Sequence, residues 1–245
     1  MADHPLPLTG ERTVPGLDHE NYWFARHVAA YAFAARRAGG LRVLDAGCGE
    51  GYGARMLDDV AAHVVGVDLV GDVVAHARGA YPGVEFLEAD LCDLPLPDAC
   101  VDLVVSLQVI EHLPDIPRFV AEMARVLRPG GELVCATPNR LTFTPGSDTP
   151  VNPFHTVEFT ASELRDTLAG PFAVQDILGL RHGRRLRAVE GLARRSLPDL
   201  VLGAPPQEWP RWLAALVARV RPGDFRLRAD DLDTSLDLVA LARRP

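Results

Sequence analysis

A run of glycines and three acidic residues stand where the strands of an α/β sheet are expected to end. Residues 43–53 read Val-Leu-Asp-Ala-Gly-Cys-Gly-Glu-Gly-Tyr-Gly, and Asp68 and Asp90 follow two further apolar runs. Glycines let the backbone turn sharply from a strand into a helix, and they let a ligand lie against main-chain atoms. A carboxylate can accept both hydroxyl groups of a ribose in charge-assisted hydrogen bonds. The pattern therefore predicts a site for a ligand that contains a nucleoside.

Two cofactor classes compete for such a site. A dinucleotide site has the spacing G-x-G-x-x-G, and counting from Gly47 places Tyr52 at the third glycine position. Counting from Gly49 places Ala54 there, which is tolerable but leaves Asp45 without a role. An acid two residues before the first glycine suits a ligand that has an ammonium group and no phosphate. S-adenosylmethionine (SAM) is such a ligand, and a nicotinamide dinucleotide is the alternative.

The segment Asp45-x-Gly47-x-Gly49-x-Gly51 resembles motif I of the class I SAM-dependent methyltransferases, and the likeness covers about residues 41–137. Later motifs of that family match Asp68-Leu69, Asp90-Leu91, Gln108 to Leu113 and Leu127 to Gly131. The resemblance implies that Asp68 binds the ribose hydroxyls, that Asp90-Leu91 holds the adenine and that Gln108 lies beneath the methionine portion. The cofactor-binding residues that we expect are Asp45, Gly47, Cys48, Gly49, Asp68, Leu69, Asp90, Leu91, Gln108, Tyr22 and Arg26.

Short apolar runs alternate with helical segments over much of the chain, which predicts βαβ units and a parallel sheet. The expected strands are 41–44, 63–67, 84–87, 101–107, 132–136, 172–178 and 234–241. The resemblance implies a Rossmann-like class I methyltransferase fold, with a seven-stranded, mostly parallel sheet and helices on both faces. Residues 1–40 are expected to form a lead-in and a helical cap, and residues 41–245 the SAM-binding domain. An insertion is expected at about residues 180–230, before the last strand.

The helix predicted at about residues 21–38 begins with Asn-Tyr-Trp-Phe-Ala-Arg. Tyr22 and its aromatic neighbours could cover the adenosine, and Arg26 could pair with the methionine carboxylate of SAM. An aromatic stripe of this kind can equally pack against the sheet. The sequence leaves both interpretations open.

A hydroxyl that accepts a methyl group must lose its proton, and histidine is the usual base near neutral pH. His155 is the leading candidate, because it lies in a loop expected at the carboxyl edge of the sheet, with Glu158 close enough to orient it. His112 follows the fourth strand and is the second candidate; it could instead form part of the shelf beneath SAM. His155 could instead merely order its loop through a hydrogen bond to the backbone. Glu111 and His112 form a weak candidate pair for a metal, and we expect no metal.

The acceptor is suggested only by resemblance. Residues 137–140 and 152–160 are similar to the same region of bacterial small-molecule and sugar O-methyltransferases. Four further segments resemble the mycofactocin oligosaccharide methyltransferases, which methylate a glucose hydroxyl: 9–16, 20–27, 178–183 and 232–238. The resemblance implies O-methylation of a sugar hydroxyl on a glycan or glycosylated cofactor. A nicotinamide oxidoreductase, a non-catalytic SAM-binding module and an RNA methyltransferase stay as alternatives.

The composition restricts the partners. All 25 basic residues are arginine, so a Walker-A phosphate loop and a Schiff-base lysine are excluded. The net charge of −8 makes nucleic acid an unfavourable partner, although six arginines gather between residues 181 and 195. Four cysteines without a CxxC pair, and apolar runs too short to cross a membrane, fit a cytoplasmic protein. We expect a small-molecule or oligosaccharide acceptor and leave the oligomeric state open.

Overall fold

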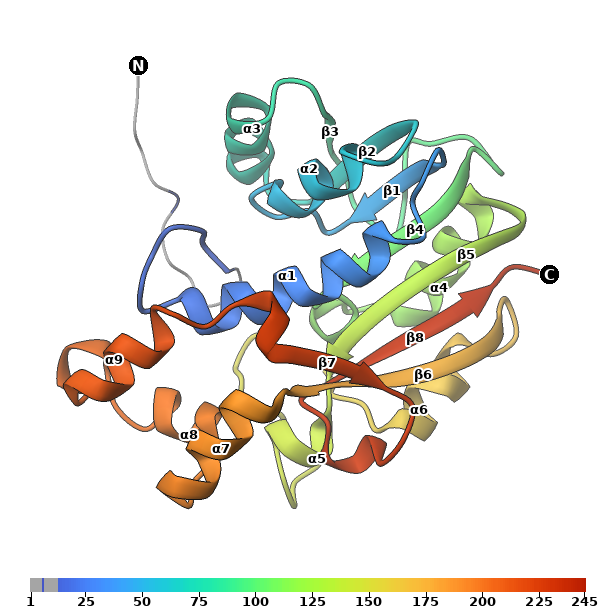
Figure 1. The fold of residues 1–245 in the computed structure, drawn as a ribbon. Coiled ribbons are helices and arrows are strands. Elements are labelled where there is room, and N and C mark those ends of the chain that lie inside the picture. The colour runs from blue at the N-terminus through green and yellow to red at the C-terminus, as the bar shows by residue number, and fades with distance from the viewer. Residues whose placement is uncertain (1–5, 7–12) are drawn as a thin grey trace.

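The computed structural model describes residue 6 and residues 13–245. Most of the lead-in, including the part of the 9–16 motif before residue 13, therefore lies outside the described residues. The described chain forms one mixed sheet with helices on both faces (Figure 1).

The sheet has the strand order β3-β2-β1-β4-β5-β8-β6-β7. The strands are β1 (Arg42–Ala46), β2 (His63–Asp68), β3 (Glu85–Glu88), β4 (Val101–Leu107), β5 (Leu127–Pro138), β6 (Ala173–His182), β7 (Phe225–Arg228) and β8 (Asp237–Arg243). The first five run parallel, whereas β8 is antiparallel to both β5 and β6, and β7 is antiparallel to β6. This confirms the Rossmann-like, mostly parallel sheet.

The sheet has eight strands where seven were expected. The additional strand is β7, which lies inside the predicted insertion and pairs with the end of β6. Its sequence is Phe-Arg-Leu-Arg, and it forms the outer edge of the sheet. Four residues with two arginines give little apolar signal, and edge strands are commonly short and charged. The insertion is therefore partly an extension of the sheet.

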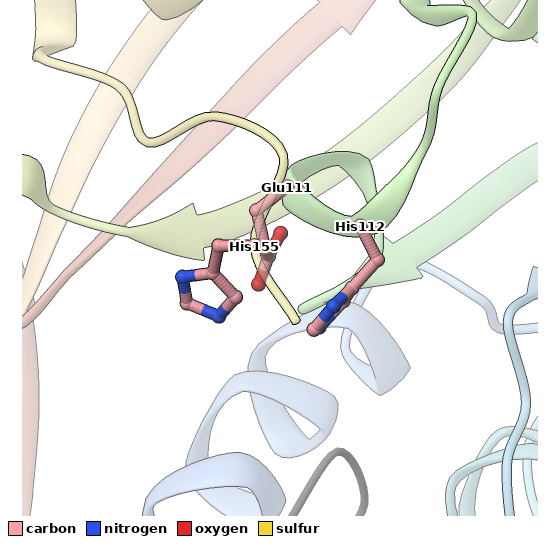
Figure 2. Close-up of side chains that lie close together, drawn as sticks. All are labelled: Glu111, His112 and His155. Atoms are coloured by element: carbon pink, nitrogen blue, oxygen red, sulfur yellow. The ribbon is translucent and has the colours of Figure 1, made fainter. Parts of the chain in front are cut away.

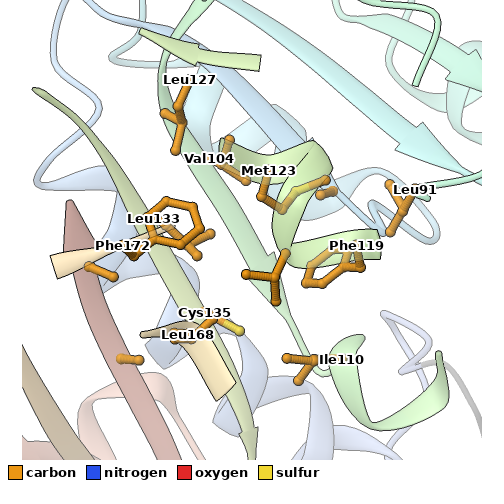
Figure 3. Packing of buried hydrophobic residues seen from close by; sticks show 14 of the residues in the cluster. Leu91, Val104, Ile110, Phe119, Met123, Leu127, Leu133, Cys135, Leu168 and Phe172 are labelled. Atoms are coloured by element: carbon orange, nitrogen blue, oxygen red, sulfur yellow. The ribbon is translucent and has the colours of Figure 1, made fainter. Parts of the chain in front are cut away.

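The helices are α1 (Asn21–Ala35), α2 (Tyr52–Asp58), α3 (Gly71–Ala80), α4 (Ile116–Val126), α5 (Arg140–Phe143), α6 (Ala161–Leu168), α7 (Arg184–Ala193), α8 (Leu197–Leu202) and α9 (Arg211–Val217). Alternate residues of the central strands face two separate apolar cores. Leu133 and Cys135 of β5 join the core beneath α4 and α6 (Figure 3), and Val134 and Ala136 join the core beneath α1, α2 and α3. Side chains that alternate between two faces and are buried on both are typical of a central strand that is covered by helices on each side.

The insertion packs on the first half of α1. Tyr22 and Ala25 of α1 share a third apolar cluster with Leu186, Leu213 and Phe225. The helix α6 begins at a capping box, in which the Thr160 hydroxyl accepts the Glu163 N–H and the Glu163 carboxylate accepts the Thr160 N–H. Among residue 6 and residues 13–245, no helix is long and apolar enough to cross a membrane.

Candidate functional site

The turn from β1 into α2 takes its shape from three glycines with left-handed backbone angles. The φ angles are +84° at Gly47, +51° at Gly49 and +84° at Gly51. A Cβ atom at position 47 would come within 2.3 Å of a methyl carbon of Val109, so the turn and the segment after β4 touch closely. A Cβ at position 49 would meet nothing within 4 Å. The turn therefore leaves open space beside its main chain, which a ligand can use.

A cavity of about 620 Å³ lies against this turn, at the carboxyl ends of the parallel strands. We call it the donor cavity. Its wall includes eight of the residues that the sequence predicted for the cofactor, namely Gly47, Cys48, Gly49, Asp68, Leu69, Asp90, Leu91 and Gln108. The structure thus brings together residues from four separate turns, at the place where open α/β sheets bind ligands.

The two predicted acids in the wall of this cavity, Asp68 and Asp90, are held by main-chain donors. Asp68 accepts hydrogen bonds from the N–H groups of Gly49 and Val70, at 3.0 and 3.1 Å. Asp90 accepts one from the N–H of Cys92, at 2.8 Å. Because the Asp68 carboxylate bridges the glycine turn and the start of α3, its position is coupled to the shape of the turn. A fixed carboxylate of this kind is suited to bind ribose hydroxyls.

Asp45 lies behind the turn and is 1% exposed. The Tyr31 hydroxyl of α1 donates to both of its carboxylate oxygens, at 3.0 and 3.2 Å. Burial raises the pKa of Asp45 to about 7. Asp45 belongs to β1, since the strand continues to Ala46, whereas the sequence placed it at the strand's end. Its contact with the cofactor stays a prediction.

A smaller cavity of about 320 Å³ adjoins the first, and we call it the adjoining cavity. Thr13, His27, Gln108 and His112 line both cavities. The adjoining cavity is also lined by aromatic, amide and charged side chains, including Trp23, Arg26, Glu111, Phe143, Asn152, His155 and Asp237. A ligand in the donor cavity and one in the adjoining cavity would therefore meet beside Gln108 and His112.

Both candidate bases lie in this wall, where Figure 2 shows His112 and His155 on either side of Glu111. The rings of His112 and His155 are 5.0 Å apart, centre to centre. Nδ1 of His155 lies 2.8 Å from Oε1 of the buried Glu158, and Nε2 lies 3.1 Å from the Asn152 amide nitrogen. An acid accepts and an amide nitrogen donates, so Nδ1 carries the proton and Nε2 is an acceptor. Burial lowers the pKa of His155, which favours this neutral form.

Glu111 is fully buried between the two histidines. Its Oε2 accepts a hydrogen bond from the Thr137 hydroxyl at 3.0 Å, and its Oε1 has no hydrogen-bond partner among the described residues. Burial raises the pKa of Glu111 to about 8. Its main-chain carbonyl accepts from the N–H of Thr156 at 2.7 Å, which ties the loop of His155 to the turn after β4.

The helix α1 places its two predicted residues differently from expectation. Arg26 lines the adjoining cavity, and its guanidinium is bound to both carboxylate oxygens of Asp237 in β8. Tyr22 lies in the cluster under the insertion, where its hydroxyl is 2.8 Å from Nε2 of His182 and its ring packs on Phe225. Tyr22 thus packs as core, the alternative that the sequence left open. The predicted pairing of Arg26 with SAM stays a prediction, and it requires Asp237 to share this guanidinium.

His27 is a residue of the site that sequence reasoning passed over. Its Nε2–H donates to the Leu107 carbonyl at 3.3 Å, and its Nδ1 accepts from the Tyr52 hydroxyl. Burial lowers the pKa of His27 to about 4, so it stays neutral. The signal in the sequence was the helical spacing of positions 23, 26, 27 and 30, which share one face of α1 and line the adjoining cavity.

A larger hollow of about 1070 Å³ lies along α7, β6 and β7, away from these residues. It contains most of the arginine cluster, in which Arg181 pairs with Asp231 and Arg185 pairs with Asp224. Acids therefore neutralise part of its positive charge. This weakens the case for a nucleic acid on that surface.

Comparison with known proteins agrees with the geometry of the donor cavity. Residues 44–135 match the family model described as a methyltransferase domain. A protein of Mycolicibacterium smegmatis, described as a "Probable S-adenosylmethionine-dependent methyltransferase", is 51% identical over 98% of this chain and 96% of its own length. A Mycobacterium tuberculosis protein with the same description is 53% identical over 98% of this chain and 90% of its own length.

The fold is also found in solved structures. One is a complex of the Haloferax volcanii Trm112 methyltransferase activator with a methyltransferase, with a TM-score of 0.63, 22% identity and coverage of 90% of this chain and 91% of that chain. At this identity the similarity shows the fold alone. The relatives decide between the two cofactor classes in favour of SAM. The eight predicted residues that line the donor cavity, with its open main chain at Gly49, fit that cofactor.

Proposed function

Because this chain belongs to the class I SAM-dependent methyltransferase family, we propose that it methylates a hydroxyl group of a small molecule bound in the adjoining cavity. The observation that carries the proposal is the shared wall of the two cavities. Gln108 and His112 line both, and His155 lies in the wall of the adjoining cavity with Nε2 as an acceptor. When bound, SAM supplies an already activated methyl group, so the chain mainly has to align the acceptor and take up its proton.

In this proposal Asp68 holds the ribose hydroxyls, and Asp90 with Leu91 holds the adenine. His155 takes up the proton of the hydroxyl, since Glu158 fixes the ring and stabilises the charge that forms on it. His112 lines both cavities and positions the acceptor next to the methyl group. The cofactor residues, His112 and His155 thus follow one another from the donor cavity into the adjoining cavity, as the transfer of a methyl group to a hydroxyl requires. This arrangement supports a hydroxyl group as the methyl acceptor.

We further propose that the acceptor is a sugar hydroxyl of a glycan or of a glycosylated cofactor. Trp23 and Phe143 offer aromatic faces in the adjoining cavity, and Gln108, Asn152 and Asp237 offer hydrogen-bonding groups. Sugars present both an apolar ring face and several hydroxyls, so this mixture suits them. The resemblance to oligosaccharide methyltransferases points in the same direction.

The test is to incubate the purified protein with SAM carrying a ¹³C-methyl group and with glucose-containing oligosaccharides. The expected product is a sugar methyl ether, seen as a labelled O-methyl signal by NMR. His155→Gln should lower kcat by about 10²–10⁴-fold and leave the Kd for SAM unchanged. The matched control is His63→Gln. This residue begins β2, at the end of the strand opposite to Asp68 and the donor cavity, and its imidazole is half-exposed. Label on nitrogen or carbon instead of oxygen would overturn the proposal.

A further inference from the structure

We propose that Glu111, His112 and His155 bind one divalent transition-metal cation in the wall of the adjoining cavity. Each residue offers one ligand atom, and these three atoms lie within 4.8 Å of one another. Figure 2 shows the Glu111 carboxylate between the two imidazole rings. Two nitrogens and one oxygen from two histidines and an acid form a donor set that Zn²⁺, Mn²⁺, Fe²⁺ and Co²⁺ accept, whereas Mg²⁺ and Ca²⁺ prefer oxygen ligands throughout.

Both imidazoles are oriented as metal ligands usually are. Nδ1 of His112 lies 3.0 Å from the carbonyl oxygen of Phe154, and a carbonyl can only accept, so this nitrogen carries the proton. Nδ1 of His155 is bound in the same way to Glu158, which is 3% exposed. Each histidine therefore keeps the Nε2 lone pair. Metal-binding histidines characteristically donate their other N–H to a carbonyl or a carboxylate, which fixes the ring and raises its basicity.

The charge of the site is the second reason. Glu111 and Glu158 are both buried acids, and each has one carboxylate oxygen without a hydrogen-bond partner in the part of the chain that the structure describes. Arg26, which lies nearby, is already bound to both oxygens of Asp237. A buried carboxylate with an unpartnered oxygen is costly, and a doubly charged cation next to Glu111 would stabilise the ionised form of this acid.

Binding requires one side chain to move. The Asn152 amide nitrogen lies 3.1 Å from Nε2 of His155 and has to turn away when this lone pair binds the cation. Asn152 lies in the loop before α6, and its Oδ1 also accepts the N–H of Phe154. With three protein ligands, the cation keeps open positions for an oxygen of another molecule.

The cation site stands on these side chains alone, and its role in catalysis rests on the proposed function. A hydroxyl oxygen that binds to the cation becomes more acidic. In the metal-bound protein His155 would be a ligand, and the more acidic hydroxyl would give up its proton to solvent water as the methyl group is transferred.

The experiment titrates chelator-treated full-length protein with Co²⁺ and with Mn²⁺, using calorimetry and the visible absorption of Co²⁺. One cation per chain is expected. Glu111→Gln and His112→Gln should each weaken binding more than 10-fold, and Glu158→Gln, which removes only the orienting acid, by about 10–100-fold. His63→Gln should bind as the unaltered protein does. Binding of SAM by each variant reports that it is folded.

Two results would overturn the site: no stoichiometric binding by the unaltered protein, or an affinity in all three variants that equals that of the unaltered protein. The cation site and the proposed function fail separately. A sugar methyl ether formed by protein that binds no cation refutes the cation site and leaves the proposed function in place. A bound cation with no oxygen-methylated product supports the site and refutes the proposed function.

Discussion

Arg26 in α1 and Asp237 at the start of β8 form a buried ion pair through two guanidinium nitrogens and both carboxylate oxygens. The pair joins the first helix to the last strand, at the wall of the adjoining cavity. Arg26 also donates to the Leu236 carbonyl at 2.9 Å. Two residues that are 211 positions apart in the sequence thus determine how the helical cap is attached to the sheet.

Asp237→Ala should lower the free energy of unfolding by about 3–5 kcal/mol, because it leaves the Arg26 charge buried without its partner. Urea unfolding followed by circular dichroism measures this. Arg55→Ala breaks an exposed pair with Asp59 and should cost less than about 1 kcal/mol. Equal effects of the two substitutions would contradict the assignment of the buried pair.

Asp68→Asn should weaken SAM binding by about 10–100-fold. The neutral amide loses charge-assisted hydrogen bonds, each of which contributes about 1.5–3 kcal/mol. Calorimetric titration with SAM provides the Kd. The control is Asp93→Asn, which neutralises a strongly exposed acid close to Asp90 and should leave the Kd unchanged. An unaltered Kd in the Asp68 variant would remove this residue from the cofactor site.

The stability of the protein without SAM should fall as the pH rises through about 7. The pKa of Asp45 is about 7 in the folded protein, whereas an aspartate in an unfolded chain has a pKa of about 3.8. The folded protein therefore binds this proton more tightly than the unfolded chain does. The resulting stabilisation is fully present below about pH 4 and is lost as the pH passes 7. Asp45→Asn should therefore be more stable than the unaltered protein at pH 8, by at most about 4 kcal/mol.

Melting temperatures of both proteins at pH 5 and pH 8 test this difference. The asparagine oxygen can still accept the hydrogen bond of Tyr31, so the substitution mainly removes the charge. If both proteins lose the same stability between pH 5 and pH 8, ionisation of Asp45 is not the cause.

Gly47→Ala and Gly49→Ala should differ in their effect on stability. Both positions have positive φ angles, which costs an alanine about 1–2 kcal/mol. At position 47 the added methyl group also comes within 2.3 Å of Val109, while at position 49 it meets open space. Chemical denaturation should show the larger loss for Gly47→Ala. The Gly49 variant should instead lose affinity for SAM, since its methyl group occupies free space beside the turn.

The donor cavity could be predicted because its parts are local. Each strand ends in its own turn, and the rule that parallel strands present their carboxyl ends at one edge brings Gly49, Asp68 and Asp90 together. The capping box at Thr160 and Glu163 likewise depends only on residues that are neighbours in the sequence. Six of the seven predicted strands differ from expectation only in their ends, and the strand at residues 101–107 has the predicted bounds.

The adjoining cavity depends on contacts between distant segments, and much of it escaped prediction. The partner of Arg26 is Asp237, and no pattern near either residue indicates the other. Tyr22 was a candidate lid because an aromatic stripe has the same spacing in a lid as in a core. The strand β7 was missed because it is short and charged, and because it lies at the edge of the sheet and pairs with β6 alone.

The insertion contacts the first half of α1, and the same helix presents Trp23, Arg26 and His27 to the adjoining cavity. In the proposed function, the residues that hold the acceptor and those that hold SAM therefore lie largely on different stretches of the polypeptide. If the acceptor binds in the adjoining cavity, we expect related enzymes to differ in residues 184–224 and in the side of the cap that these residues support. Divergence within this group should accordingly concentrate in that stretch.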